Sequence, residues 1–76
     1  MTLNELSTAL QEMYETAPQG EKAAMIHLFG IRYAAEIKDS DFSINDIVKK
    51  AGLSSTYVTE INKGIRLAPY VIERNQ

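Results

Sequence analysis

The segment AGLSSTYVTEINKG, from Ala51 to Gly64, decides how the rest of the chain is interpreted. Gly52 stands where a short helix can end on a residue with positive φ, a conformation that glycine adopts at the least cost. On both sides of this glycine, apolar residues recur among polar ones in the pattern expected of two short helices. The apolar positions are Ile47, Val48, Leu53, Val58 and Ile61. This pattern predicts two helices packed against each other across a three-residue turn, which is a helix-turn-helix arrangement.

The N-terminal segment predicts a first helix of about 15 residues. Thr2 and Glu5 form the T-x-x-E pattern of a capping box, which signals a helix start. Apolar residues then follow at spacings of three and four, namely Leu3, Leu6, Leu10, Met13 and Ala17. Two interpretations of this stripe stay open. We favour packing on the next helix, because two heptads are too few for a coiled coil. The other is a homodimer contact through Leu3, Leu6, Leu10 and Met13.

A second helix is expected from about Glu21 to Lys38. Its apolar residues cover more than one side, which predicts a central position with neighbours on two sides. Ser43 and Asp46 then form a second N-terminal cap, of the form S-x-x-D, for a third helix with the sequence INDIVKKA.

A fourth helix is expected to begin at a cap on Ser54 or Ser55, to run to about Lys63 and to end at Gly64. Pro69 suits the first turn of a short last helix. The apolar residues after it are expected to pack back on the core; they are Tyr70, Val71 and Ile72.

These segments predict an all-α fold of four to five short helices with a central helix-turn-helix. We expect a single helical domain over residues 1–76. It would consist of an N-terminal helical pair (1–42), the helix-turn-helix (43–64) and a short C-terminal helix or tail (65–76). With 45% hydrophobic and 24% charged residues, the chain has the composition of a folded domain rather than a disordered one.

The sequence contains no cysteine, which excludes disulfides and thiolate metal sites and favours a cytoplasmic location. No apolar run approaches the roughly 20 residues of a membrane span, and the N-terminus does not resemble a signal peptide, so we expect no membrane association. The one histidine, His27, is interpreted as a partly buried structural residue. Because no phosphate loop, nucleophile elbow or HExxH motif is present, we expect neither an enzyme nor a metal or cofactor site.

Charge is unevenly distributed along the chain. The net charge of −2 argues mildly against a nucleic-acid partner. However, residues 1–42 carry seven acidic and three basic side chains, whereas residues 43–76 carry three acidic and five basic ones. An acidic half joined to a basic half can still present one basic face.

The stretch AGLSSTYVTEINKGIR resembles the second half of a Cro/repressor-type (XRE-like) helix-turn-helix, whose recurring run has the form aGlSqsyiSeiErGkR. The residues that match this run are Ala51, Gly52, Leu53, Ser54, Tyr57, Val58, Glu60, Ile61, Gly64 and Arg66. The sequence departs from that family at Ile44, Asn45 and Val48, where Ser, Gln and Ala are common, and it lacks the usual long C-terminal helices. The stretches LFGIRYAAEI and KGIRLAPYV are also similar to small bacterial HTH-like domains.

The resemblance implies sequence-specific binding of double-stranded DNA, with residues 54–63 as the recognition helix. Short hydroxyl side chains on the outer face of this helix support DNA binding. Because serine and threonine have low helix propensity, a helix that only faced water would more often carry better helix formers at these positions. The base-side candidates are Ser55, Thr56, Thr59 and Lys63, and the phosphate-side candidates are Ser54, Tyr57, Arg66, Lys49 and Lys50. The expected role is transcription regulation or DNA targeting within a larger assembly. The alternative is a protein–protein interaction module that uses the acidic N-terminal half.

Overall fold

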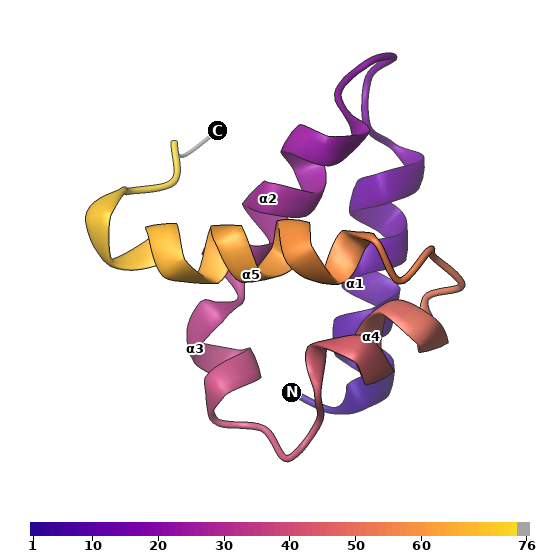
Figure 1. Ribbon diagram of the computed structural model, residues 1–76, viewed down its shortest axis with the longest axis vertical. Helices are drawn as coiled ribbons and strands as arrows, with labels where there is room; N and C mark the ends of the chain where they lie inside the picture. Colours follow the sequence, from indigo (N-terminus) through magenta and orange to yellow (C-terminus); the bar gives the residue numbers. More distant parts are fainter. Residues whose placement is uncertain (75–76) are drawn as a thin grey trace.

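The structure is a computed structural model that describes residues 1–74. Within this range the chain forms five α-helices and one 3-10 helix and no strand, as the sequence predicts. The elements are α1 (Leu3–Glu15), α2 (Lys22–Arg32), α3 (Ala34–Lys38), α4 (Ile44–Lys50), α5 (Tyr57–Leu67) and η1 (Ala68–Tyr70). α5 crosses in front of α2, and α4 lies beside the N-terminal half of α5 (Figure 1).

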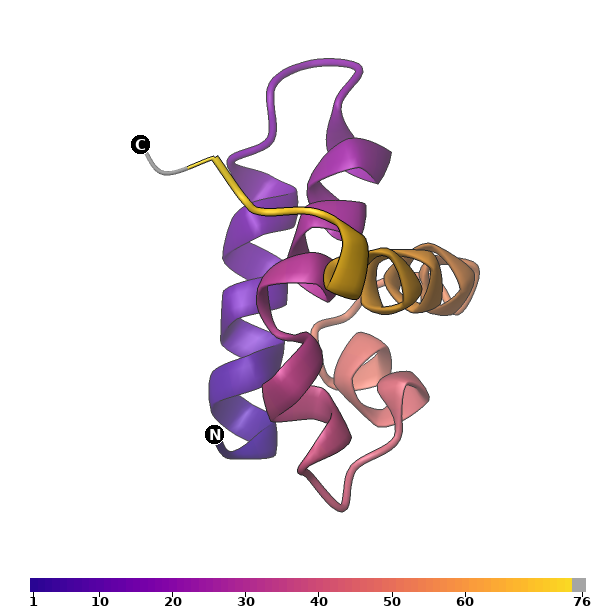
Figure 2. The same cartoon turned by 90° about the vertical axis from the view of Figure 1, so that its left-hand side faces the viewer.

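α1 and α5 lie on opposite sides of the fold. Turned by a quarter, the molecule shows α5 nearly end-on at one side, α1 at the other side and α2 between them (Figure 2). α2 packs against both of these helices, most extensively against α5. The central position that the sequence predicts for this segment is therefore confirmed.

One apolar core joins all five α-helices. Its fully buried members include Leu6, Leu10, Ile26, Phe29, Ile47, Val48 and Ile61. The stripe of α1 supplies Leu6, Leu10 and Met13 to this core, which confirms that it packs inside the chain. A homodimer contact through Leu3, Leu6, Leu10 and Met13 is therefore unsupported, because three of these four side chains are not accessible to a second copy.

Both predicted capping boxes are present. At the start of α1, the amide of Glu5 donates to Thr2 Oγ1 at 3.0 Å and the amide of Thr2 donates to Glu5 Oε1 at 2.8 Å. These hydrogen bonds with Thr2 lower the pKa of the Glu5 carboxyl. At the start of α4, Ser43 and Asp46 form the same reciprocal pair, with both distances at 3.0 Å. The two helix starts are thus fixed by local sequence.

The predicted second helix is interrupted. Tyr33 leaves the helical conformation, with φ −109° and ψ 19°, so that α2 ends at Arg32 and α3 begins at Ala34. The Tyr33 ring stays against Phe29, with ring centroids 5.1 Å apart. Apolar residues face the core both before and after Tyr33. Their periodicity alone therefore predicts one continuous helix.

Gly64 does not end a helix, contrary to the prediction. α5 continues to Leu67, and Gly64 lies buried in its interior against Gly30 of α2. A Cβ atom on Gly64 would overlap the carbonyl oxygen of His27 and would lie 3.0 Å from Gly30 Cα. A Cβ atom on Gly30 would likewise overlap the carbonyl oxygen of Ile61. The two backbones approach this closely because neither residue has a side chain.

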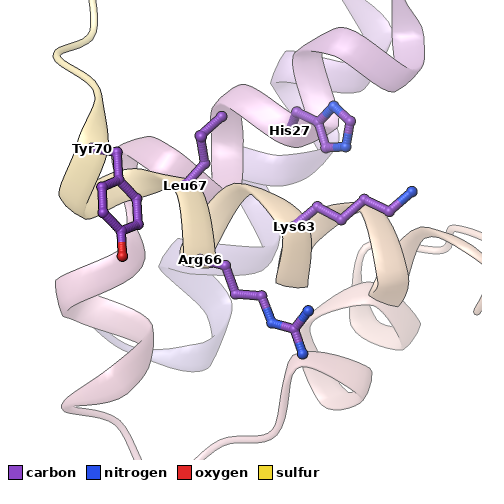
Figure 3. A pocket seen from close by; sticks show the side chains of 5 residues that line it. All are labelled: His27, Lys63, Arg66, Leu67 and Tyr70. Atoms are coloured by element: carbon purple, nitrogen blue, oxygen red, sulfur yellow. The ribbon is translucent and has the colours of Figure 1, made fainter.

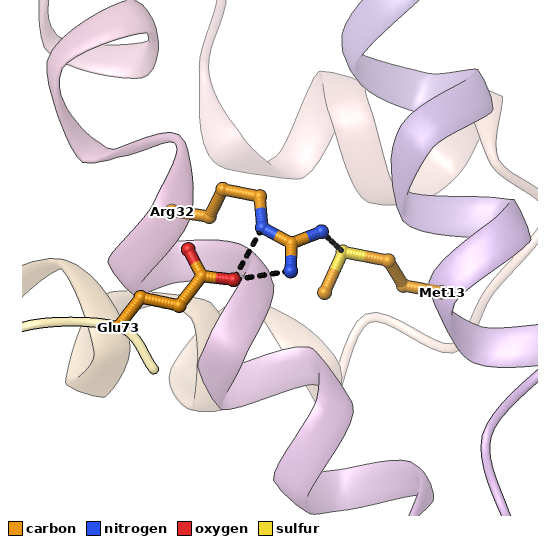
Figure 4. Close-up of polar contacts among 3 residues, drawn as sticks. All are labelled: Met13, Arg32 and Glu73. Carbon is orange, nitrogen blue, oxygen red and sulfur yellow. Dashed lines mark hydrogen bonds and ion pairs between the residues drawn. The ribbon is translucent and has the colours of Figure 1, made fainter. Parts of the chain in front are cut away.

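The C-terminal residues do not pack back on the core as expected. Pro69 lies in the first turn of a short last helix, as predicted, but Tyr70 and Ile72 are 82% and 96% exposed. The tail is held instead by Arg32, whose Nε donates to Glu73 Oε1 at 2.8 Å and whose Nη1 approaches the sulfur of Met13 at 3.7 Å (Figure 4). The Arg32 guanidinium lowers the pKa of the Glu73 carboxyl.

No helix in the described part of the chain combines the length and the apolar character needed to cross a bilayer.

Gly64→Ala tests the helix crossing. Helix propensity alone predicts that alanine stabilises an interior helical position by about 1 kcal/mol. We expect the opposite sign, a loss of about 2 kcal/mol or more and a melting temperature lower by about 10 °C, because the added methyl group overpacks the crossing. Thr59→Ala, on the exposed face of the same helix, is the control and should melt at or slightly above the parent temperature. Thermal unfolding followed by circular dichroism measures both, and a Gly64→Ala variant as stable as the control would contradict the crossing.

Candidate nucleic-acid interface

The connection between α4 and α5 is built around Gly52. This residue has φ 77°, which confirms the positive φ predicted for it. Its amide donates to the Lys49 carbonyl at 3.0 Å, and the amide of Leu53 donates to the Val48 carbonyl at 3.1 Å. These bonds close the C-terminal end of α4, while the half-buried Leu53 packs against the core.

α5 begins at Tyr57, later than the predicted cap at Ser54 or Ser55. The intervening residues form a turn in which Ser54 Oγ accepts the Thr56 amide at 3.3 Å and lies 3.0 Å from Thr56 Oγ1. The connection is therefore longer than three residues. The hydroxyls of Ser54 and Thr56, predicted to face phosphate and bases respectively, are exposed but already contact each other.

Tyr57 anchors the start of α5 on α1. Its ring meets the Tyr14 ring edge to face, with centroids 5.5 Å apart and planes at 70°. Lys22 Nζ lies 4.2 Å from the centroid of the Tyr14 ring and completes this contact. Hydrogen bonding with Tyr14 raises the pKa of the Tyr57 hydroxyl. The residue predicted to reach phosphate thus contributes first to packing, and its hydroxyl stays neutral.

The outer face of α5 carries a continuous row of exposed polar side chains. With a helical advance of 100° per residue, those of Thr59, Asn62 and Arg66 fall within a sector of about 60° that points away from the buried Ile61. We call the polar stripe the row formed by these three residues together with Ser55, which is exposed in the turn before α5. Lys63 is exposed beside it.

Asn62 was not among the residues predicted from the sequence. The prediction rested on short hydroxyl groups and on cations, so it named Lys63 and Arg66 but passed over the amide of Asn62. The signal was nevertheless available, because Asn62 follows Thr59 by three residues and precedes Arg66 by four. Such spacing places the three side chains on one helical face.

Glu60 turns away from the polar stripe, although the sequence places it on the outer face. Its Oε2 lies 2.7 Å from Nε2 of His27 on α2 and 3.9 Å from Nζ of Lys63. The side chain of His27 is 40% exposed, in agreement with its interpretation as a partly buried structural residue. The pair of His27 and Glu60 links α5 to α2. It holds the one carboxylate of α5 at the edge of the polar stripe.

A groove of about 270 Å³ separates α4 from the start of α5. Its walls are formed by Asn45, Val48, Lys49, Leu53 and Ser55. The structure therefore brings Lys49 next to Ser55, two residues predicted from the sequence to contact phosphate and bases. Lys50 is exposed but does not line this groove, because it points about 100° further round α4.

Comparison with known proteins agrees with this arrangement. A family described as an HTH-like domain matches residues 2–74, and the chain belongs to this family. No curated protein and no solved structure matches the chain. The match supports a helix-turn-helix type of domain without a subtype, and the resemblance to Cro/repressor proteins therefore stays a prediction.

The conformation of Gly52 gives a direct test of the turn. Gly52→Val should lower the free energy of unfolding by more than about 1 kcal/mol, because a β-branched residue is strained at positive φ. Gly52→Asn is the matched control, since asparagine tolerates this conformation and no atom lies within 4 Å of the added Cβ. Urea unfolding of both variants measures the difference, and equal midpoints would show that the turn does not require a left-handed residue.

Proposed function

We propose that this member of the HTH-like domain family binds double-stranded DNA, with α5 in the major groove. The observation that carries the proposal is the polar stripe, which presents donors and acceptors along the whole outer face of α5. The family supports DNA binding as a possibility for the chain, and the side chains of the stripe supply the specific chemistry.

Each member of the stripe suits a contact in the major groove. Asparagine can bind adenine through two hydrogen bonds, and arginine can bind guanine in the same way. Serine and threonine hydroxyls can pair with several base edges, and a threonine methyl can contact the methyl group of thymine. Asn62 and Arg66 are therefore the side chains that we expect to discriminate most strongly between bases, while Ser55 and Thr59 add weaker preferences.

Basic side chains beside the stripe are placed to contact phosphates. Lys49 lines the same groove as Ser55, and Lys63 is exposed on α5 beside the stripe. Lys50 is exposed at the end of α4 and adds positive charge nearby. Such contacts fix the register of a protein on the duplex without reading sequence. The helix α1, which carries Glu5, Glu12 and Glu15, lies on the opposite side of the fold from α5, so its carboxylates repel the duplex least.

The biological role that fits this activity is regulation of transcription or the targeting of a larger assembly to DNA. A domain of this size presents one recognition helix, which covers only a few base pairs. High specificity would therefore require a second DNA-binding unit, either another copy or another domain, and the buried stripe of α1 cannot bring two copies together.

The double variant Thr59→Ala/Asn62→Ala tests the stripe. Both side chains are exposed, so the protein should fold normally, with a slight gain in helix propensity. Affinity for the best duplex selected from a random library should fall at least about tenfold, because each good base contact contributes roughly 1–3 kcal/mol. Fluorescence anisotropy with labelled duplex measures the affinity, and circular dichroism verifies the fold.

Thr8→Ala/Gln11→Ala is the matched control for this experiment. It removes one threonine and one amide at the same spacing from the exposed face of α1, on the side of the fold away from α5. This control should keep the parent affinity. If the α5 variant folds and also keeps the parent affinity, α5 does not read DNA and the proposed function is wrong.

Salt dependence tests the phosphate contacts. The logarithm of the DNA-binding constant should fall linearly with the logarithm of salt concentration, because bound lysines and arginines release condensed counterions. Lys63→Gln should reduce the steepness of this line by about one unit. Arg74→Gln, in the tail that passes towards α1, should leave the slope unchanged. Equal slopes for the parent protein and the Lys63→Gln variant would exclude a contact between Lys63 and a phosphate.

A further inference from the structure

A second groove lies at the C-terminal end of α5 and shares Arg66 with the polar stripe. It has a volume of about 390 Å³ and is lined by His27 of α2, by Lys63, Arg66 and Leu67 of α5, and by Tyr70 of η1 (Figure 3). Leu67 and Tyr70 form an apolar wall at one end, and the alkyl parts of Lys63 and Arg66 continue it along α5.

The apolar wall of this groove is not covered by the chain itself. Leu67 is 46% exposed and Tyr70 is 82% exposed, and the neighbouring Ile72 is almost fully exposed. The tail that follows could have folded over them, but the pairing of Arg32 with Glu73 holds it towards α1 (Figures 2 and 4). Exposed apolar side chains grouped in this way are typical of interaction sites.

The charged rim of the groove is positive. Arg66 pairs with no carboxylate among residues 1–74. Within the described part of the chain, the one carboxylate that Lys63 approaches is that of Glu60, at 3.9 Å, and this carboxylate lies much closer to His27, at 2.7 Å. Two cationic groups are thus available beside an apolar wall, in a chain whose net charge is −2.

We propose that this groove docks an acidic segment of a partner protein, with one apolar or aromatic side chain of the segment placed against Leu67 and Tyr70. Carboxylates of the segment would pair with Lys63 and Arg66, so charge complementarity selects the partner. A peptide suits the site better than a small molecule, because the groove is open to solvent along Leu67 and Tyr70, which are 46% and 82% exposed. A ligand enclosed on most sides would need a deeper pocket.

Docking of such a segment would compete with DNA, because Lys63 and Arg66 serve both surfaces. This consequence alone rests on the proposed function. The partner would then release the protein from its duplex by occupying the positive charges that phosphate and guanine require. Binding of the acidic segment without DNA does not depend on the proposed function and can be tested separately.

The test uses the full chain and a short fluorescein-labelled peptide of Asp and Glu residues with one central Phe. Anisotropy titration in low salt should show saturable binding. Tyr70→Ala should weaken it by about tenfold or more, as expected for an aromatic side chain at the centre of an interface. Ile72→Ala, an equally exposed apolar residue that does not line the groove, is the control and should bind like the parent. A peptide with Asn and Gln in place of Asp and Glu should bind at least about tenfold more weakly.

Several results would overturn the proposal. They are the absence of saturable binding, equal losses in the Tyr70→Ala and Ile72→Ala variants, and equal binding of the neutral peptide. A dimer in sedimentation experiments that Tyr70→Ala dissociates would assign the groove to a second copy and would also overturn it. Tyr70→Ala should keep its affinity for duplex DNA within about twofold, because Tyr70 lies outside the polar stripe. Peptide binding without DNA binding would leave this proposal intact and contradict the proposed function alone.

Discussion

The close approach of Gly30 and Gly64 is the contact on which the rest of the structure depends. Because neither residue carries a side chain, the backbones of α2 and α5 meet directly, with no room for a methyl group between them. This contact seats Ile61 and Ile65 in the core and turns the opposite face of α5 outward. The polar stripe is exposed as a consequence, and so is the groove at the end of the same helix.

Two further contacts fix the part of α5 that precedes this crossing. The Tyr14 and Tyr57 rings hold its first turn on α1, and the pair of His27 and Glu60 links its middle to α2. A recognition helix held at several points can place its side chains against base edges with little loss of conformational entropy on binding. The acidic helix α1 takes part in this support while it remains on the far side of the fold.

Local features of the fold could be predicted from the sequence, whereas features set by contacts between distant segments could not. The two capping boxes and the positive φ of Gly52 depend on neighbouring residues, and all three predictions are confirmed. Gly64 was interpreted as a helix end because glycine often ends a helix. Its actual role depends on contact with Gly30, which lies 34 positions earlier and is not recognisable as its partner from the neighbouring sequence. The exposed tail depends in the same way on Arg32. Asn62 could have been found from its spacing, because it lies inside the predicted helix, three residues after Thr59 and four before Arg66.

The most direct test of the account is amide chemical-shift mapping by NMR during titration with a short random duplex in low salt. The account predicts that the shifts concentrate at the polar stripe, at Lys63 and at Lys49, while the amides of α1 stay unchanged. Shifts centred on α1, or an unchanged spectrum at saturating duplex, would contradict the claim that the crossing of α2 and α5 presents a DNA-binding face.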